Sequence, residues 1–498
     1  IYSQRGSYLV YKIYTNIDTV VFQLCSHNTI PLSLATMRTV KKSLIICTSS
    51  LIFITVVAAL VFYFRNLDRI NFEDDQDEME KWMDDYPTES EIGLDTTVKS
   101  VSEFEELTKI PTPELTTKAS KGLILGKDVN ISRIFDTVKL NFSQIAFNLG
   151  YDCVDYEVAT QDGYLLKIFR VKGSVDARPV LLVHTFLDSA DTFILRGSQS
   201  LVGALHTADR DVWIINFRGN KYSRKHKTLN PDNDKSFWSF SFHEHGVYDL
   251  TSTIDFVLET TRRNRLQVVS YSQGSTAFFA MSSTRPEYSN KVELLLLLAP
   301  ICHFENLQPA IPKLMLSDTV LNIILGSLGN GEIFRSYTQF ANFIKKICSS
   351  GFISNEMCFH GYLGNSEEIK LDFLPLLYAH YPAGTSMKNL KHITQLYSRK
   401  TFSQYDYAFL QNMFEYGSFV PPQYDLSKVS MKVVMFAARN DKISLWQDVE
   451  VLRKELPNVV EHRAVHRRRF NHTDYVWGQN VHKYLYPQVV KLLHKYYN

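Results

Sequence analysis

The sequence lacks a strong net charge and a cysteine-rich framework. Lys and Arg number 54 and Asp and Glu 52, a formal net charge of +2 over 498 residues. The overall charge therefore gives no reason to expect a nucleic acid or another strongly charged partner. The six cysteines form no CxxC pair and no Cys/His cluster with metal-ligand spacing, so we expect neither a metal nor another cofactor.

One long uncharged run stands near the N-terminus, at residues 44–64, and basic residues flank it on both sides. It is long enough to span a bilayer. We favour an uncleaved signal anchor over a cleaved signal peptide, because the run has few of the small residues that a cleavage site needs. A buried core helix is the third interpretation. The first methionine is Met37, so residues 1–36 are taken as upstream sequence and excluded from fold reasoning.

The basic flank is stronger on the N-terminal side of this run, which places the rest of the chain in the lumen of the secretory pathway or outside the cell. Residues 71–109 are acidic and poor in aliphatic side chains, as expected of a stem or propeptide; a specific acidic interaction site is the alternative. Asn130 and Asn141 each begin an N-x-S glycosylation triplet, which is modified only in that compartment.

Beyond Gly150 the chain is rich in apolar residues and alternates between strand and helix patterns. Two alternating stretches within residues 156–171 meet at Asp162-Gly163, which predicts a hairpin. Leu250, Ile254, Val257 and Leu258 recur at helical spacing. Short apolar runs suit strands buried on both faces of a parallel sheet, and so predict an α/β layered domain. These runs cover residues 180–183, 212–215, 266–269, 294–298 and 433–436.

Aromatic and irregular sequence interrupts this alternation before the last predicted strands. We interpret it as a mainly helical cap inserted over the carboxyl edge of the sheet. The resulting organisation is an upstream segment 1–36, a signal anchor or signal peptide 37–69, an acidic stem 70–129, a first core part 130–302, a cap 303–422 and a second core part 423–498.

Ser272 is the candidate nucleophile. The segment 268–276 is a strand that enters a helix through a tight turn, the setting that exposes a serine hydroxyl at a sheet edge. The usual motif is G-x-S-x-G, and here Ser270 stands at the first glycine while Gly274 keeps the second. An ordinary serine-rich turn is the alternative interpretation.

A nucleophilic serine needs a base and an orienting carboxylate, which in this arrangement follow in the order Ser, Asp or Glu, His. Asp441 lies in the polar turn after a predicted strand, and His472 lies in a loop after the last predicted strand. A plain turn aspartate and a structural histidine are the alternatives. For the oxyanion we expect the backbone N–H groups of Phe186, in the loop after the first parallel strand, and of Gln273.

With these residues the chain closely resembles the acid lipase family of animals, the gastric and lysosomal lipases and their insect relatives. The resemblance covers roughly residues 130–498 and rests also on the segments 216–226, 237–249 and 471–478. It implies the α/β-hydrolase fold, with Ser272, Asp441 and His472 as catalytic triad and Phe186 and Gln273 as oxyanion donors.

The resemblance further implies a cap that opens at a lipid surface, a disulfide between Cys348 and Cys358, and triacylglycerol or cholesteryl esters as substrates. A lysosomal or extracellular destination follows from the predicted topology. The triplet that begins at Asn471 is expected to stay unmodified, because a glycan beside His472 would obstruct the site.

Three positions depart from the family pattern. Ser270 replaces glycine, Tyr271 replaces the histidine before the nucleophile, and Thr185 replaces the glycine after His184. A β-branched residue at 185 is expected to alter the oxyanion loop if the backbone there needs glycine. The alternative function is therefore a catalytically weak lipid-binding or storage protein on the lipase fold. A membrane-anchored interaction protein that uses the acidic stem leaves the matched motifs unexplained.

Overall fold

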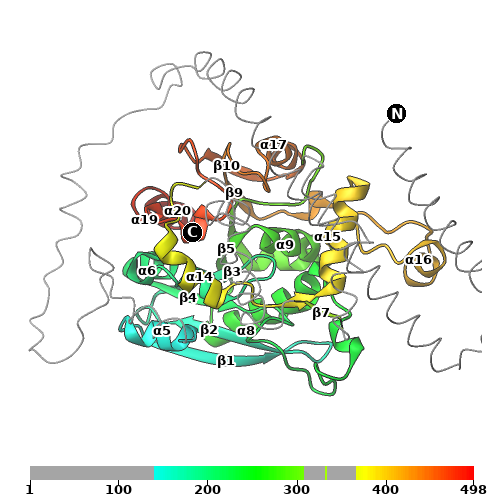
Figure 1. Cartoon of the computed structure of the whole chain (residues 1–498), viewed down its shortest axis with the longest axis horizontal. Helices are drawn as coiled ribbons and strands as arrows, with labels where there is room; N and C mark the ends of the chain where they lie inside the picture. Colours follow the sequence, from blue (N-terminus) through cyan, green and yellow to red (C-terminus); the bar gives the residue numbers. More distant parts are fainter. Residues whose placement is uncertain (1–139, 308–330, 334–365, 498) are drawn as a thin grey trace, which may run out of the picture. The chain divides into compact units, whose positions relative to one another are not determined.

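An eight-stranded, mostly parallel sheet forms the centre of the described structure (Figure 1). The computed structural model describes residues 140–307, 331–333 and 366–497. The strands of the large sheet are β1 (Cys153–Ala159), β2 (Leu165–Val171), β3 (Arg178–Val183), β4 (Arg210–Ile215), β5 (Leu266–Tyr271), β6 (Val292–Leu298), β9 (Lys432–Ala437) and β10 (Val459–Ala464). Their order is β1-β2-β4-β3-β5-β6-β9-β10. β2 is antiparallel to β1 and β4, and the other neighbouring pairs are parallel.

Helices cover both faces of this sheet (Figure 1). The described helices, with 3-10 and π-helical turns labelled η, are α5 (Phe142–Asn148), η1 (Ala190–Phe193), η2 (Gly197–Gln199), α6 (Leu201–Thr207), η3 (Lys235–Trp238), α7 (Phe242–Glu244), η4 (His245–Leu250), α8 (Thr251–Thr261), α9 (Gln273–Thr284), η5 (Pro286–Lys291), η7 (Leu371–Phe373), α14 (Leu374–His380), α15 (Met387–Arg399), α16 (Phe409–Tyr416), η8 (Leu426–Lys428), α17 (Trp446–Glu455), α18 (Asp474–Trp477), α19 (Val481–Tyr484) and α20 (Tyr486–Lys495). A two-stranded ribbon pairs β7 (Glu332–Ile333) with β8 (Thr385–Ser386).

The strand side chains alternate between two apolar clusters. In β3, Val180 and Leu182 pack on the side of α5, α6 and α20, whereas Leu181 and Val183 pack on the side of α8, α9 and α17. All four are fully buried. Successive residues of a strand point to opposite faces, so a sheet covered on both sides favours apolar residues at successive positions. This explains the continuous apolar runs and confirms the predicted α/β fold.

The predicted hairpin and helix are also present. β1 and β2 pair antiparallel across the turn that holds Asp162 and Gly163. Ile254 and Val257 lie on the buried side of α8. Leu250 is buried one residue before it, in the π-helical turn η4. All five apolar runs lie within parallel strands of the sheet, so their carboxyl ends meet at one edge.

Several predicted features lie outside the described residues. They are the segments 1–36 and 37–69, the acidic stem 70–129, Asn130, and Cys348 and Cys358 within the cap interval 303–422. From that interval the structure describes η7, α14, α15 and α16 among other residues. In the described ranges no helix is both long and apolar enough to cross a membrane.

Candidate active site

Ser272 sits in the turn between β5 and α9. Its backbone has φ 52° and ψ −121°, a region that a residue with a side chain rarely adopts and that costs about 1–3 kcal/mol. A Cβ at Gly274 would lie 2.7 Å from the Ser270 Oγ and 2.9 Å from the His184 carbonyl oxygen. Only glycine at 274 therefore lets α9 start so close to β3 and β5, and this turn holds the serine at the carboxyl edge of the sheet.

The structure brings the three predicted triad residues together. The Ser272 Oγ lies 2.8 Å from His472 Nε2, and His472 Nδ1 lies 2.8 Å from Asp441 Oδ2. The second carboxylate oxygen of Asp441 accepts the backbone N–H groups of Ile443 and Ser444, both at 2.9 Å. With Nδ1–H donating to the carboxylate, Nε2 is free to accept the serine proton.

These side chains come from separate loops at one edge of the sheet and are nearly inaccessible to solvent. Asp441 follows β9, and His472 lies between β10 and α18. The exposed fractions are 3% for Ser272, 5% for His472 and 0% for Asp441. Hydrogen bonds are electrostatically stronger in such a low-dielectric setting than in water.

A second group of hydrogen bonds holds the His472 loop. The hydroxyl of Tyr271, beside the nucleophile, donates to the His472 carbonyl oxygen at 2.8 Å. The Asn471 side-chain oxygen accepts the His472 N–H, and Asp474 accepts the Asn471 N–H, both at 2.7 Å. Burial raises the pKa of Asp474 to about 7. The sequence marked Tyr271 only as a departure from the family pattern, and its bond to His472 spans 201 positions.

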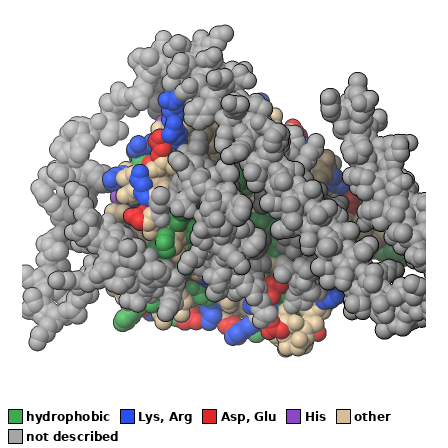
Figure 2. All heavy atoms as spheres, in the orientation of Figure 1, with side chains coloured by type: hydrophobic (Ala, Val, Ile, Leu, Met, Phe, Trp, Pro, Cys, Tyr) green, Lys and Arg blue, Asp and Glu red, His purple; other side chains and the backbone are tan. Residues whose placement is uncertain are grey.

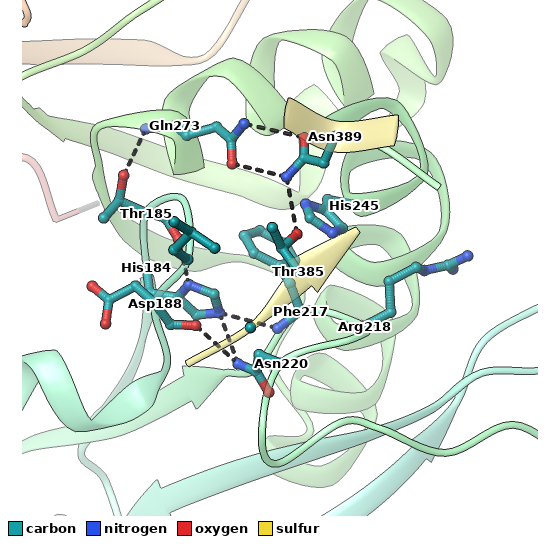
Figure 3. A pocket seen from close by; sticks show the side chains of 12 residues that line it. His184, Thr185, Asp188, Phe217, Arg218, Asn220, His245, Gln273, Thr385 and Asn389 are labelled. Atoms are coloured by element: carbon teal, nitrogen blue, oxygen red, sulfur yellow. Dashed lines mark hydrogen bonds between the residues drawn. The ribbon is translucent and has the colours of Figure 1, made fainter. Parts of the chain in front are cut away.

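The two predicted oxyanion donors differ in their surroundings. The backbone N–H of Gln273 donates to the Thr185 hydroxyl at 3.3 Å (Figure 3). In the described part of the chain, no residue accepts the N–H of Phe186. The ring of Phe186 packs against the buried Ile333.

An amide pair fixes the Gln273 side chain. Gln273 Nε2 donates to Asn389 Oδ1 at 3.2 Å, and Asn389 Nδ2 donates to Gln273 Oε1 at 3.3 Å (Figure 3). The Phe242 N–H also donates to Asn389 Oδ1, at 2.9 Å. Asn389 belongs to α15, in the interval interpreted as the cap. Sequence analysis missed it because a buried amide 116 positions away gives no local pattern.

The loop after β3 is held by a neutral histidine. The Phe217 N–H donates to His184 Nε2 at 3.1 Å, so the ring proton lies on Nδ1, which donates to the Thr185 carbonyl oxygen at 2.8 Å. Burial lowers the pKa of His184 to about 4. Asn220 adds a bond to the Asp188 carbonyl oxygen at 3.2 Å. The segment 216–226, singled out in the sequence, therefore supports the loop after β3, which holds the predicted oxyanion donor Phe186.

A small cavity lies beside this loop, with space for about one water molecule (Figure 3). Its lining includes His184, Thr185, Asp188, Asn220, Gln273 and Asn389. Among the described residues, no three His, Cys, Asp or Glu side chains are grouped as metal ligands. In the described part of the face shown in Figure 2, basic and acidic side chains are interspersed.

A serine bonded to an imidazole, an imidazole bonded to a buried carboxylate, and backbone N–H groups beside the serine form a set suited to acyl transfer. The serine attacks a carbonyl carbon, the imidazole takes the proton, and the N–H groups stabilise the oxygen that becomes negative.

Comparison with known families and proteins gives matches over most of the described region. The model of the α/β hydrolase fold matches residues 178–478, and that of a partial α/β-hydrolase lipase region matches residues 142–197. Lipase 1 of Drosophila melanogaster is 35% identical over 72% of this chain and 80% of its own length. Human gastric triacylglycerol lipase is 31% identical over 72% of this chain and 91% of its own. Human lipase member K is 30% identical over 75% of this chain and 96% of its own length.

Proposed function

The chain belongs to the acid lipase family of animals, within the α/β-hydrolase fold, and from this membership we propose that it hydrolyses triacylglycerol through an acyl-enzyme on Ser272. It is a serine ester hydrolase that cleaves fatty-acyl esters of neutral lipids. The proposal adds the residues that perform the reaction, the preferred substrate and the place where it acts.

The observation that carries the proposal is the continuous hydrogen-bond chain from the Ser272 hydroxyl through His472 to Asp441. In the first step Ser272 Oγ bonds to the ester carbonyl carbon while His472 Nε2 takes its proton. The tetrahedral intermediate then expels the alcohol, which leaves with that proton. A water molecule, deprotonated by His472, releases the fatty acid and restores Ser272. Asp441 keeps the imidazole oriented and stabilises its cation.

The N–H groups of Phe186 and Gln273 are proposed as donors to the developing oxyanion. Gln273 opens α9 directly after the nucleophile, and Phe186 lies in the loop after β3. Donors fixed in advance stabilise the charge in the transition state without having to reorganise during the reaction.

Triacylglycerol is the favoured substrate because the gastric relatives are named for it. Triacylglycerol collects at a lipid–water interface, and α16 offers a surface for such an interface. Phe409, Leu410 and Phe414 of this helix are 59%, 71% and 88% exposed. Exposed apolar side chains grouped on one element mark an interaction surface.

We place the reaction in the lumen of the secretory pathway, either lysosomal or extracellular, with residues 44–64 as the anchor or signal. Asn141 suits glycosylation there, because it is exposed and uses only its side-chain oxygen to cap α5. Asn130 and a Cys348–Cys358 disulfide complete this proposal for an oxidising compartment.

The proposal is tested by measuring fatty-acid release from emulsified long-chain triacylglycerol and from cholesteryl ester by the full chain. The wild type is expected to release fatty acid, faster from triacylglycerol, and Ser272→Ala is expected to reduce release by at least about 1,000-fold. Ser282→Ala, which changes a buried serine of α9, the helix that follows Ser272, serves as the control and is expected to stay active. A folded wild type that binds the emulsion and releases no fatty acid would favour the lipid-binding protein instead.

A further inference from the structure

Thr185 places a hydroxyl group directly at the predicted oxyanion site. Its Oγ1 accepts the backbone N–H of Gln273 at 3.3 Å, drawn as a dashed line in Figure 3. The family pattern has glycine at this position, and glycine carries no side chain. The hydroxyl is therefore a group that this chain adds to the site.

The backbone of the loop accommodates the threonine. The left-handed residue of the loop is Leu187, with φ 58°, and Thr185 is not among the described residues with positive φ. His184 Nδ1 donates to the Thr185 carbonyl oxygen, and the Phe217 N–H fixes the imidazole in turn. The hydrogen-bonded backbone therefore fixes the direction in which the Thr185 side chain leaves the chain.

The hydroxyl retains an unused donor. A threonine hydroxyl donates one proton and accepts up to two. In the described part of the chain, Thr185 Oγ1 accepts from Gln273, and no residue there accepts its proton. The distance of 3.3 Å between the Gln273 nitrogen and the Thr185 oxygen is long for such a hydrogen bond. Replacing the hydroxyl by a negatively charged oxygen as acceptor therefore costs little hydrogen-bond energy.

We propose that the Thr185 hydroxyl is a third oxyanion donor, beside the N–H groups of Phe186 and Gln273. When the ester binds, its carbonyl oxygen takes over the Gln273 N–H, and the displaced hydroxyl turns to donate its own proton to the same oxygen. The C=O π electrons move to that oxygen as the Ser272 Oγ bond forms, and the serine proton goes to His472. Thr185 keeps its proton throughout and is unchanged when the alcohol leaves.

Gln273 is held in place for this exchange. Its side chain is paired with Asn389 in both directions, so the N–H can change acceptors without movement of the helix start. The two hydrogen bonds between the Gln273 and Asn389 side chains lie on the other side of Gln273 from Thr185 in Figure 3. The step therefore requires only rotations within the Thr185 side chain, about Cα–Cβ to move the oxygen and about Cβ–Oγ1 to aim its proton.

The inference rests on the proposed function and is tested with the full chain on a soluble short-chain ester. Thr185→Val keeps the branched shape and removes the hydroxyl, whereas Thr185→Ser keeps the hydroxyl and removes the methyl group. Thr185→Val is expected to reduce kcat roughly 100-fold with KM changed less than about threefold, because the hydrogen bond from the hydroxyl becomes much stronger when the carbonyl oxygen turns negative in the transition state. Thr185→Ser is expected to keep kcat within about fivefold of wild type.

Thermal midpoints of all variants show whether the fold is retained, and Thr185→Ala serves as the second variant without a hydroxyl. Hydrolysis by Thr185→Val or Thr185→Ala as fast as wild type, or faster, would overturn the inference. The hydroxyl would then contribute nothing to catalysis or would hinder it. An equal loss in Thr185→Ser would overturn it as well, since the methyl group would then be the important part. A wild type without Ser272-dependent hydrolysis would overturn the proposed function together with this inference.

Discussion

Two buried aspartates near the oxyanion loop differ in how their charge is compensated. Asp191 is fully buried, yet Lys221 and His380 hold its pKa below the ordinary value against the effect of burial. For Asp188, burial raises the pKa to about 8, against the lowering effect of the Ser189 N–H. Asp188 therefore carries a proton in the folded protein over a pH range in which an unfolded chain loses it.

This difference predicts a pH dependence of stability at Asp188. Between its ordinary pKa of 3.8 and the folded value of about 8, the unfolded state loses the proton first. The contribution of Asp188 to folding is therefore present at acid pH and declines as the pH rises through this window. The thermal midpoint of wild type minus that of Asp188→Asn is expected to fall by at least about 2 °C between pH 4.5 and pH 8.

The comparison isolates Asp188 from the other buried groups, including His184, that titrate in both proteins. Asp176→Asn changes a fully exposed side chain and is the control, for which the difference is expected to stay constant. A constant difference for Asp188→Asn too would show that its carboxyl titrates normally.

Ser270 predicts a gain in stability. Its hydroxyl is fully buried, and no described residue bonds it. A Cβ at Gly274 would lie only 2.7 Å from it, so the hydroxyl lies directly against that glycine. An unpaired buried hydroxyl costs about 1–3 kcal/mol, so Ser270→Ala is expected to raise the thermal midpoint by about 2–8 °C.

The control for this substitution lies five positions along the chain. Ser275 has a bonded hydroxyl that accepts the Ile301 N–H at 3.0 Å and donates to the Ser272 carbonyl oxygen. Ser275→Ala is expected to lower the midpoint. A lower midpoint for both variants would mean that the Ser270 hydroxyl is satisfied after all.

At the scale of single elements, α16 reverses the usual arrangement of a surface helix. Its buried position is Asn412, 1% exposed, whose amide donates to Asp406 and accepts the Tyr407 N–H. Its outward positions include Phe409 and Phe414. Hydrogen bonds on its buried side thus hold the helix while its apolar side chains face solvent. This is the reverse of an amphipathic helix that packs on a core.

This arrangement predicts a selective effect on the emulsified substrate. Phe409→Ser combined with Phe414→Ser is expected to reduce fatty-acid release from a triacylglycerol emulsion at least about fivefold, since less apolar area is then available for adsorption. Hydrolysis of a soluble short-chain ester is expected to stay within about twofold. Phe147→Ser, which removes a 78% exposed phenylalanine from α5, is the matched control. Equal losses on both substrates would contradict an interfacial role.

At the scale of the whole molecule, the sequence predicted the sheet well because its signal is local. A strand buried on both faces is mainly apolar, and β3, β5 and β6 consist mainly of apolar residues, with Gln267 and Ser270 as buried polar exceptions in β5. The carboxyl ends of parallel strands lie at one edge, so positions after predicted strands, together with the chain order and the family resemblance, brought Ser272, Asp441 and His472 into one hypothesis. The turn chemistry around Asp162-Gly163 gave the hairpin in the same way.

The supporting residues of the site were not predictable on the same grounds. Asn389 reaches Gln273 across 116 positions, and Tyr271 reaches His472 across 201. Such contacts depend on how separate elements pack, and no spacing or composition records them. The Thr185 hydroxyl is the clearest case: the sequence predicted that its β-branch alters the loop after β3 if the backbone there needs glycine, whereas the structure shows the hydroxyl accepting the N–H of Gln273, a proposed oxyanion donor.

The central claim, that Ser272 is an activated nucleophile, is tested most directly by labelling the full chain with a fluorophosphonate probe and locating the adduct by mass spectrometry. We predict one adduct, on the peptide that contains Ser272, formed slowly in His472→Ala and absent from Ser272→Ala. An adduct on another serine, or a folded wild type that remains unlabelled, would contradict the account.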